Sequence, residues 1–96
     1  MEFEWDPAKD ASNRAKHGLG FGEIVVIFAD QETTIVDLTE PEHGETRFKA
    51  IGHYGDQIVA VIFTMRAGMC RIISARSSSR NERKEPRQGE AIARWY

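Results

Sequence analysis

The sequence predicts a small α+β domain in which an antiparallel sheet of three or four strands packs with two N-terminal helices and a C-terminal helix. Small and apolar residues recur at helical spacing in the first 30 residues. β-Branched and alternating segments follow as far as residue 75, with turn signals between them. At 96 residues the chain is long enough for one hydrophobic core. We expect a single domain over residues 1–85 and an extension over residues 86–96 that is helical or disordered.

The N-terminal residues are expected to form a short strand and a helix. Residues 3–5 look like the strand, and Asp6 and Pro7 then supply an N-cap and a proline suited to the first helical position. The helix should run to about His17 and stop at Gly18. One of its faces is polar and basic, because four residues recur at i, i+4, i+7 and i+8 spacing, namely Lys9, Asn13, Lys16 and His17.

A second helix is predicted over residues 21–29, and strands follow it. The helix has apolar residues at helical spacing, although its EIVVIF run is also compatible with a strand. The stretch 57–65 is apolar at nearly every position, as expected for a central strand covered on both faces. Strands are expected over residues 33–38, 46–54, 57–65 and 70–75, with a loop at residues 40–45 and turns at residues 55–56 and 67–68.

The stretch from Cys70 to Arg83 joins the last strand to the last helix and concentrates basic residues. Ser79 and Glu82 have the S-x-x-E spacing of a capping box, so the helix should begin near Arg80. Free N–H groups and the helix dipole favour an anion at such a junction, and guanidinium groups bind phosphate in bidentate fashion. We therefore interpret the junction as a site for a nucleic-acid phosphate, formed by Arg71, Arg76, Arg80 and Arg83.

Charge is distributed unevenly along the chain, although its net value is only −2. Residues 1–48 carry four Lys and Arg against eleven Asp and Glu, a net charge of −7. Residues 49–96 carry nine Lys and Arg against four Asp and Glu, a net charge of +5. This pattern suits an anionic ligand on one side of the protein and a basic partner on the other. An ordinary solvated surface with uneven charge is the alternative.

The composition disfavours several classes of protein. The longest apolar run, residues 58–63, is too short to cross a bilayer, and the acidic start MEFEWD does not look like a signal peptide. We therefore expect a cytoplasmic protein without membrane contact. Cys70 is the single cysteine, which excludes an internal disulfide, and we expect it to be a buried small residue. The three histidines show no ligand spacing, so no metal or other cofactor is expected.

Several motifs of this chain occur together, and in the same order, in one known family. They are Asn13, Phe21 and the segments FEWDPAK (3–9), KHG (16–18), RFKAIG (47–52), RIISAR (71–76) and ER (82–83). Through these residues the chain resembles the BrnT toxins of bacterial type II toxin–antitoxin systems over residues 3–83. One departure is Pro86, which stands where the family often has an aromatic residue.

The resemblance implies a fold, an activity and a partner. The implied fold is similar to RelE, with a small antiparallel sheet packed on helices. The implied activity is that of an endoribonuclease that cleaves mRNA and inhibits translation. The implied partner is a BrnA-like antitoxin whose ribbon-helix-helix domain binds operator DNA, so that the complex represses its own operon. A heterotetramer of toxin and antitoxin is compatible with this assembly.

The candidate catalytic residues follow from the chemistry of metal-free RNA cleavage. The 2′-OH attacks the adjacent phosphorus, and the enzyme must move protons and stabilise an anionic phosphorane. We expect Arg76 to clamp the scissile phosphate, supported by Arg80 and Arg83. His17 is the first choice for the proton shuttle, because histidine titrates nearest to neutral pH. Further contacts with RNA are assigned to Lys16, Arg71, Lys49 and His53.

Each candidate also has a structural interpretation. Arg71 could pair with a carboxylate on a neighbouring strand, and Arg83 could form an i, i+3 or i, i+4 ion pair. Glu82 fits a helix cap better than a general base. His17 could satisfy the carbonyl groups at the end of its helix. The polar strand face of residues 47–53 is a track for RNA, a solvated face or a surface covered by the antitoxin.

Two other functions stay open. In the first, the chain is a non-catalytic partner of the antitoxin that acts in DNA binding and operon autorepression, with its arginines on carboxylates or DNA phosphates. This function predicts salt-sensitive binding without a cleavage product. In the second, the chain is an inactive relative kept as a decoy, for which the substitution at Pro86 is the motivating observation.

Overall fold

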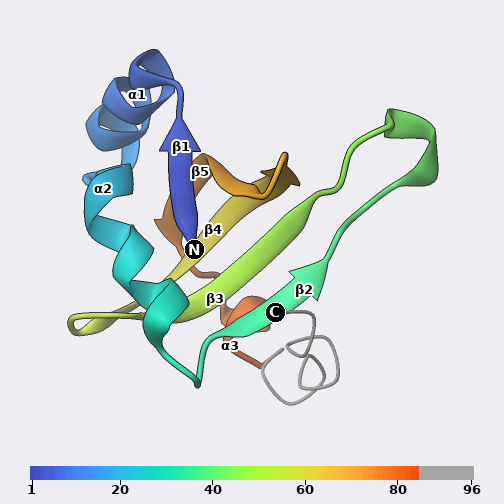
Figure 1. Cartoon of the computed structure of the whole chain (residues 1–96). Coiled ribbons are helices and arrows are strands. Elements are labelled where there is room, and N and C mark those ends of the chain that lie inside the picture. Colours follow the sequence, from blue (N-terminus) through green and yellow to red (C-terminus); the bar gives the residue numbers. More distant parts are fainter. Residues whose placement is uncertain (85–96) are drawn as a thin grey trace.

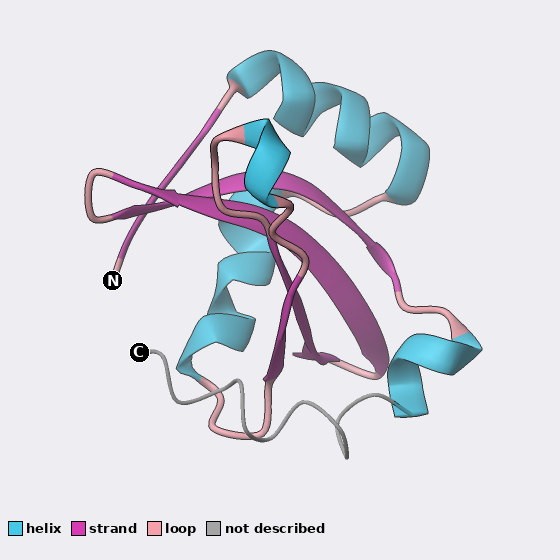
Figure 2. Ribbon diagram, turned by 90° about the vertical axis from the view of Figure 1, so that its right-hand side faces the viewer, coloured by secondary structure: helices cyan, strands magenta, loops and turns pink. Residues whose placement is uncertain are grey.

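A five-stranded sheet forms the centre of the protein (Figures 1 and 2). The computed structural model describes residues 1–84, except for the side chains of His43, Arg83 and Lys84. The strands are β1 (Glu2–Trp5), β2 (Thr34–Asp37), β3 (Phe48–Tyr54), β4 (Gln57–Arg66) and β5 (Met69–Ser77), in the order β1-β5-β4-β3-β2. The helices are α1 (Pro7–His17), α2 (Phe21–Ile24), α3 (Arg80–Lys84) and the 3-10 helices η1 (Val25–Ala29) and η2 (Pro41–His43).

Strand β1 corrects the expectation of a sheet with three or four strands. The sequence predicts a short strand here but does not add it to the sheet. In the structure β1 pairs with β5 in parallel, with Phe3 opposite Cys70 and Trp5 opposite Ile72. The other neighbouring strands are antiparallel, so the sheet is mixed. This pairing packs the rings of Phe3 and Trp5 against the core, an effect of distant residues that local periodicity does not report.

Helix α1 begins and ends at the predicted residues. The carboxylate of Asp6 accepts the N–H of Ala8 at 2.9 Å, and Pro7 occupies the first turn. At the other end, Gly18 has a left-handed φ of 71° and donates its N–H to the carbonyl of Arg14 at 2.9 Å. Glycine accepts this conformation because it has no Cβ. The helix lies against β5.

Asn13 attaches α1 to the edge of β5. Strand β1 ends at Trp5, opposite Ile72, so the later residues of β5 have no β1 partner along that edge. There the side-chain oxygen of Asn13 accepts the N–H of Ala75 at 3.0 Å, and its Nδ2 donates to the carbonyl of Leu19 at 2.9 Å. The Asn13 side chain is buried. A side-chain amide thus replaces strand pairing and satisfies buried backbone groups on both elements.

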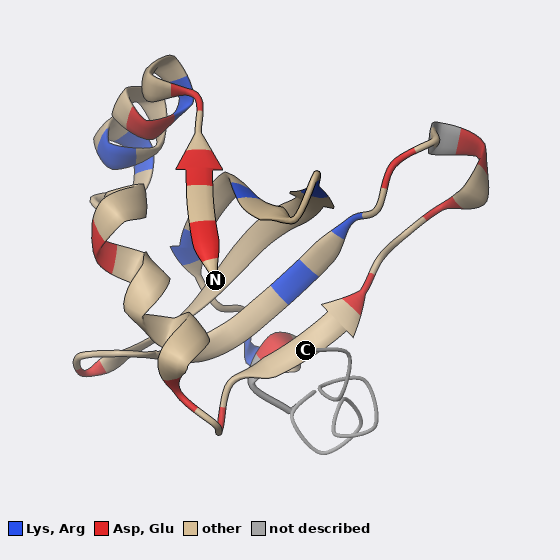
Figure 3. Ribbon diagram, in the orientation of Figure 1, with Lys and Arg blue, Asp and Glu red and all other residues tan. Residues whose placement is uncertain are grey.

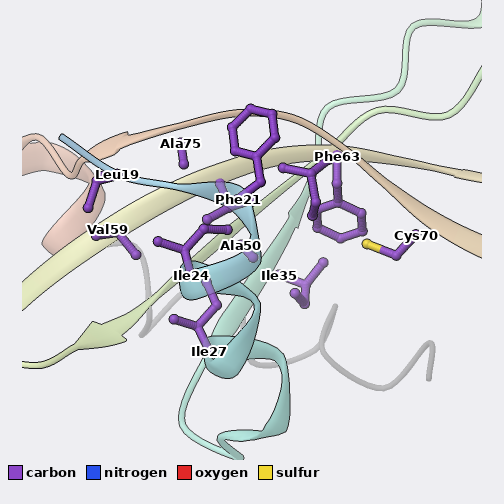
Figure 4. Close-up of a cluster of buried hydrophobic side chains, with 12 residues drawn as sticks. Leu19, Phe21, Ile24, Ile27, Ile35, Ala50, Val59, Phe63, Cys70 and Ala75 are labelled. Carbon is purple, nitrogen blue, oxygen red and sulfur yellow. The ribbon is translucent and has the colours of Figure 1, made fainter. Parts of the chain in front are cut away.

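The segment that is ambiguous in sequence is helical, as predicted, and changes from α-helix to 3-10 helix after Ile24. Phe21, Ile24 and Ile27 are fully buried on its inner side. Figure 4 shows their side chains packed with those of strand residues, including Ala50, Val59, Phe63 and Cys70. Removal of this apolar surface from water supplies most of the stabilisation of such a core. Cys70 is buried here, as predicted.

The two faces of the sheet carry different elements. Helices α2 and η1 cover the face with the apolar core. Helix α3 lies at the other face (Figure 2), where Glu82 contacts Lys49 of β3 and Arg76 of β5. The connection between β2 and β3 extends away from the sheet in Figure 1, and the predicted loop there contains η2. The expected extension over residues 86–96 lies outside the described residues. Within residues 1–84, no helix has the length and apolar character needed to cross a membrane.

Candidate active site

Arg76 and Glu82 form a bidentate ion pair at the junction of β5 and α3. Nη1 of Arg76 donates to Oε1 of Glu82 and Nη2 donates to Oε2, both at 2.6 Å. Nη1 also donates to the carbonyl of Ser77 at 3.3 Å. The side chain of Glu82 is only 5% exposed, whereas that of Arg76 is 40% exposed. The pair therefore has a buried carboxylate and a guanidinium that reaches solvent.

The carboxylate of Glu82 is also bound from two other elements. It accepts the backbone N–H of Ser79 at 2.7 Å, and the N–H of Glu82 returns to the hydroxyl of Ser79 at 3.1 Å. These two bonds confirm the predicted capping box. Nζ of Lys49 lies 3.1 Å from Oε2 of the same carboxylate. Glu82 thus joins β3, β5 and the start of α3.

This environment changes the pKa values of both members of the pair. Hydrogen bonds from Arg76, and with smaller effect from Ser79 and Lys49, lower the pKa of Glu82 to about 2, although burial alone would raise it. The same contact raises the pKa of Arg76. Glu82 is therefore ionised at neutral pH and is a weak base, which agrees with its predicted role as a cap rather than a general base.

The guanidinium of Arg76 has a second edge that can bind an anion. Among residues 1–84, Arg76 donates to Glu82 from Nη1 and Nη2 and to the carbonyl of Ser77 from Nη1. A guanidinium carries five N–H donors in a planar fork, and its Nε–Nη2 edge is a separate bidentate donor. The bonds to Glu82 do not use Nε, so a phosphate on the Nε–Nη2 edge is compatible with the ion pair.

A basic pocket lies between α1 and β5. It has a volume of about 220 Å³ and is lined by Lys9, Ser12, Asn13, Lys16, His17, Ile73 and Ser74. Its lining contains two lysines and a histidine but no carboxylate, which favours an anionic ligand. The contact of Asn13 with β5 places this face of α1 over the strand, because Lys9 and His17 are one turn away on either side of Asn13.

The pocket adjoins the face of the sheet that carries Arg76. Ser74 pairs with Ile62 and Arg76 pairs with Ala60, so Ser74 and Arg76 lie two residues apart on one face of β5. A register shift near Ile62 and Phe63 leaves Ile73 as an extra residue in β5. Such a bulge changes the direction of neighbouring side chains. Among the described residues, no hydrogen bond or ion pair joins His17 to Arg76.

The predicted group of four arginines is not a single cluster in the structure. Nη1 of Arg71 lies 3.5 Å from the carboxylate of Glu4, its cross-strand neighbour on β1, as the structural interpretation predicted. Arg71 is thereby separated from the junction, because the added strand β1 engages the start of β5. Arg80 is exposed at the first residue of α3. The side chain of Arg83 lies outside the described part of the chain.

The other predicted contacts with RNA lie in three places. Lys16 and His17 share the pocket between α1 and β5. The side chain of Lys49 is 12% exposed and forms an ion pair with Glu82. Lys49 therefore has a structural role in holding this carboxylate. His53 is exposed near the end of β3, opposite Ile58. The structure thus brings Lys16 and His17 to one wall and Arg76 to the adjoining strand face.

Sequence reasoning missed two roles within this site. It placed Asn13 on the polar face of the first helix but did not predict its bridge between Leu19 and Ala75. It recognised Glu82 as a cap but not as the residue that joins Lys49 to Arg76. The capping-box spacing is a local signal, whereas both missed contacts connect distant segments. In the sequence Asn13 is one polar residue on a polar helical face, and only the structure shows that its side chain is buried.

Comparison with known proteins covers the whole of this site. A protein-family model described as the ribonuclease toxin BrnT of a type II toxin–antitoxin system matches residues 5–82. No curated protein matches the chain. The matched residues include the basic face of α1, all of β5 and the Arg76–Glu82 pair. The chain therefore belongs to the BrnT family of ribonuclease toxins of type II toxin–antitoxin systems.

Proposed function

We propose that the protein is a metal-independent endoribonuclease that cleaves mRNA and so inhibits translation. The ribonuclease toxin activity is that of its family. The observation that carries the finer proposal is the partly exposed side chain of Arg76, on the strand that also lines a pocket with Lys9, Lys16 and His17. An arginine fixed on one edge and open on the other is suited to a phosphate that becomes more negative during the reaction.

The proposed reaction is an intramolecular phosphoryl transfer from the 5′-oxygen to the 2′-oxygen of the RNA. The 2′-oxygen attacks the adjacent phosphorus and loses its proton, the bond from phosphorus to the 5′-oxygen breaks, and that oxygen takes up a proton. The products are a 2′,3′-cyclic phosphate and a 5′-hydroxyl. Arg76 stabilises the phosphorane, and His17 transfers the protons. Glu82 is assigned neither proton transfer, because a carboxyl group with a pKa of about 2 is a weak base and is not protonated at neutral pH.

The remaining predicted residues contribute to binding in this proposal. Arg80 and Lys16 approach the phosphates on either side of the scissile one, and Arg83 supports them from α3. His53 and Lys49 extend the contact along β3. Arg71 has the weakest support, because Glu4 already occupies its guanidinium. All of these contacts neutralise phosphate charge and add affinity without reading sequence.

The antitoxin partner of this toxin is proposed to be a BrnA-like protein. Membership of a type II system implies an antitoxin, and the family resemblance supports one with a ribbon-helix-helix domain. Operator DNA would then be contacted through the antitoxin alone. The two chains would repress their own operon together.

The test is cleavage of RNA by the full-length chain in EDTA, with free mRNA and with translating ribosomes. We expect fragments with cyclic phosphate ends, and we expect Arg76→Ala and His17→Ala to slow cleavage by about a hundredfold or more. Arg66→Ala, at the exposed last residue of β4, is the matched control and should cleave as wild type. A 2′-O-methyl group at the cut site should block the reaction. Salt-sensitive binding without product, or full activity of Arg76→Ala, would contradict the proposal.

A further inference from the structure

Glu82 is bound more extensively than a helix cap requires. A capping box needs only the reciprocal bonds with Ser79. The structure adds two bonds from Arg76 and one contact with Lys49 and buries the carboxylate between them. Burial of a charged carboxylate is costly unless every oxygen is paired, so this arrangement needs all of its donors. The contacts with Arg76 and Lys49 go beyond the capping box and indicate a second role for Glu82.

We propose that Glu82 is a positioning residue that fixes the guanidinium of Arg76 for RNA cleavage. This inference rests on the proposed function, in which Arg76 binds the scissile phosphate. The two 2.6 Å bonds define the plane and the rotation of the guanidinium. They leave the Nε–Nη2 edge directed away from Glu82. The carboxylate is itself held from Ser79 and Lys49, so it cannot follow the arginine if the arginine moves.

Positioning lowers the entropy that is lost when RNA binds. A free arginine must give up much of its rotational freedom to make two parallel bonds with a phosphate. In this protein that freedom is already lost on folding, because Glu82 holds one edge. A preorganised donor acts most strongly on the crowded, more negative transition state. Loss of Glu82 should therefore reduce the rate of the chemical step more than it reduces binding.

The change in charge alone predicts that loss of Glu82 strengthens RNA binding. Glu82 is the carboxylate that lies between two cations at the proposed site. Its replacement by glutamine makes the site more positive by one unit, which strengthens attraction for the RNA backbone. If the mutant binds RNA at least as well as wild type but cleaves it more slowly, the slower cleavage comes from the lost orientation of Arg76 and not from the change in charge.

The experiment compares Glu82→Gln, Arg76→Ala and the double variant in the full-length chain, with metal-free RNA cleavage as the readout. We expect Glu82→Gln to lower kcat about tenfold to hundredfold with an unchanged or lower KM. In the Arg76→Ala background, Glu82→Gln should have no further effect on kcat, because the residue acts through Arg76. Ser79→Ala is the matched control. It weakens the cap but keeps the backbone N–H and both guanidinium bonds, so its kcat should equal that of wild type.

Glu82→Asp provides a second, independent variant. It keeps the charge but shortens the side chain, so a positioning role predicts a loss of kcat and a purely electrostatic role predicts none. If circular dichroism shows that Glu82→Gln is unfolded, Glu82→Asp replaces it in the kinetic comparison. Wild-type kcat in Glu82→Gln or Glu82→Asp, or a loss that adds fully to that of Arg76→Ala, would overturn the inference. If Arg76→Ala itself cleaves as wild type, the proposed function fails first, and the two failures are thereby distinguished.

Discussion

Hydrogen bonding and burial have opposite effects on the pKa of Glu82. Burial disfavours the charged form and would raise the pKa, whereas donors from Arg76, Ser79 and Lys49 favour the charged form. The donors dominate, and the pKa falls from 4.5 to about 2. A lowered pKa in the folded state means that the folded protein is more stable with this carboxyl group ionised than with it protonated. The ion pair at the proposed site therefore also makes stability depend on pH.

We predict that acid destabilises the protein partly through Glu82. The contribution of this residue is complete above pH 4.5 and is lost as the pH falls toward 2. The wild-type urea midpoint should fall steeply from pH 5 to pH 2.5, and Glu82→Gln should be less stable at pH 7 by about 1–3 kcal/mol but show a shallower fall. Glu23→Gln, which removes an exposed ion pair with Arg14, is the control. Equal slopes for wild type and Glu82→Gln would contradict this prediction.

Cys70 shows the effect of burial without compensating donors. Desolvation raises the pKa of its thiol to about 12. Because the thiolate is the reactive form, the folded protein should not react with iodoacetamide at pH 8. Mass spectrometry should detect the adduct only after unfolding in urea. Rapid labelling of the native protein would show that the β5 region opens readily.

At the level of elements, one buried amide decides where α1 lies. Asn13 supplies the acceptor for Ala75 and the donor for Leu19, on two segments far apart in the sequence. Asn13 also lines the pocket, together with Lys9 and His17 from the same face of α1. A short helix of 11 residues depends on such tertiary contacts, since it is marginal by itself in water.

We predict that Asn13→Ala destabilises the protein by about 2–3 kcal/mol, because it leaves the N–H of Ala75 and the carbonyl of Leu19 without their partner. Urea unfolding measures the loss, and hydrogen exchange should show faster exchange of the Ala75 amide. Ser12→Ala, an exposed neighbour on the same helix, should change stability by less than about 0.5 kcal/mol. Equal stability of the two variants would show that the amide bridge contributes little.

Across the whole molecule, charge that is segregated along the chain is partly mixed in space. Figure 3 shows acidic residues along the extended β2–β3 connection and basic residues on α1. Lys9 and Lys16 come from the acidic half of the sequence but line the proposed RNA site. Glu4 of that half pairs with Arg71 of the basic half. The fold thus assembles the basic site from both halves.

We predict that RNA binding depends on salt through a small number of cations. Measured with uncleavable 2′-O-methyl RNA, the slope of log K against log salt should be about −2 or steeper, because Lys16, Arg76 and Arg80 are each assigned to one phosphate. Lys16→Gln should reduce the slope by about 0.7. Arg66→Gln, which removes an exposed cation at the end of β4, should leave the slope unchanged. An unchanged slope in Lys16→Gln would exclude the α1 pocket from the RNA contact.

The elements of this protein could be predicted where their signals are local. Asp6, Pro7 and Gly18 bound α1 in the sequence and in the structure, because caps act over one helical turn. Ser79 and Glu82 gave the start of α3 for the same reason. Alternation and turn residues located the strands, and the strand starts differ by a residue or two, as at Phe48. The concentration of arginines between Cys70 and Arg83 was also visible in the sequence.

Only the tertiary structure decided which of these pieces meet. The parallel pairing of β1 with β5 added a fifth strand to the sheet. It also placed Arg71 in an ion pair with Glu4, away from the junction of β5 and α3. Because β1 is short and β5 contains a bulge, part of the edge of β5 has no strand partner. Asn13 binds this edge, and its helix thereby brings His17 and Lys16 next to the strand that carries Arg76. Sequence by itself determined the elements and the arginines, because caps, turns and alternation depend on near neighbours. Their arrangement into a site depended on contacts between residues up to 67 positions apart, as for Glu4 and Arg71, which no local pattern encodes.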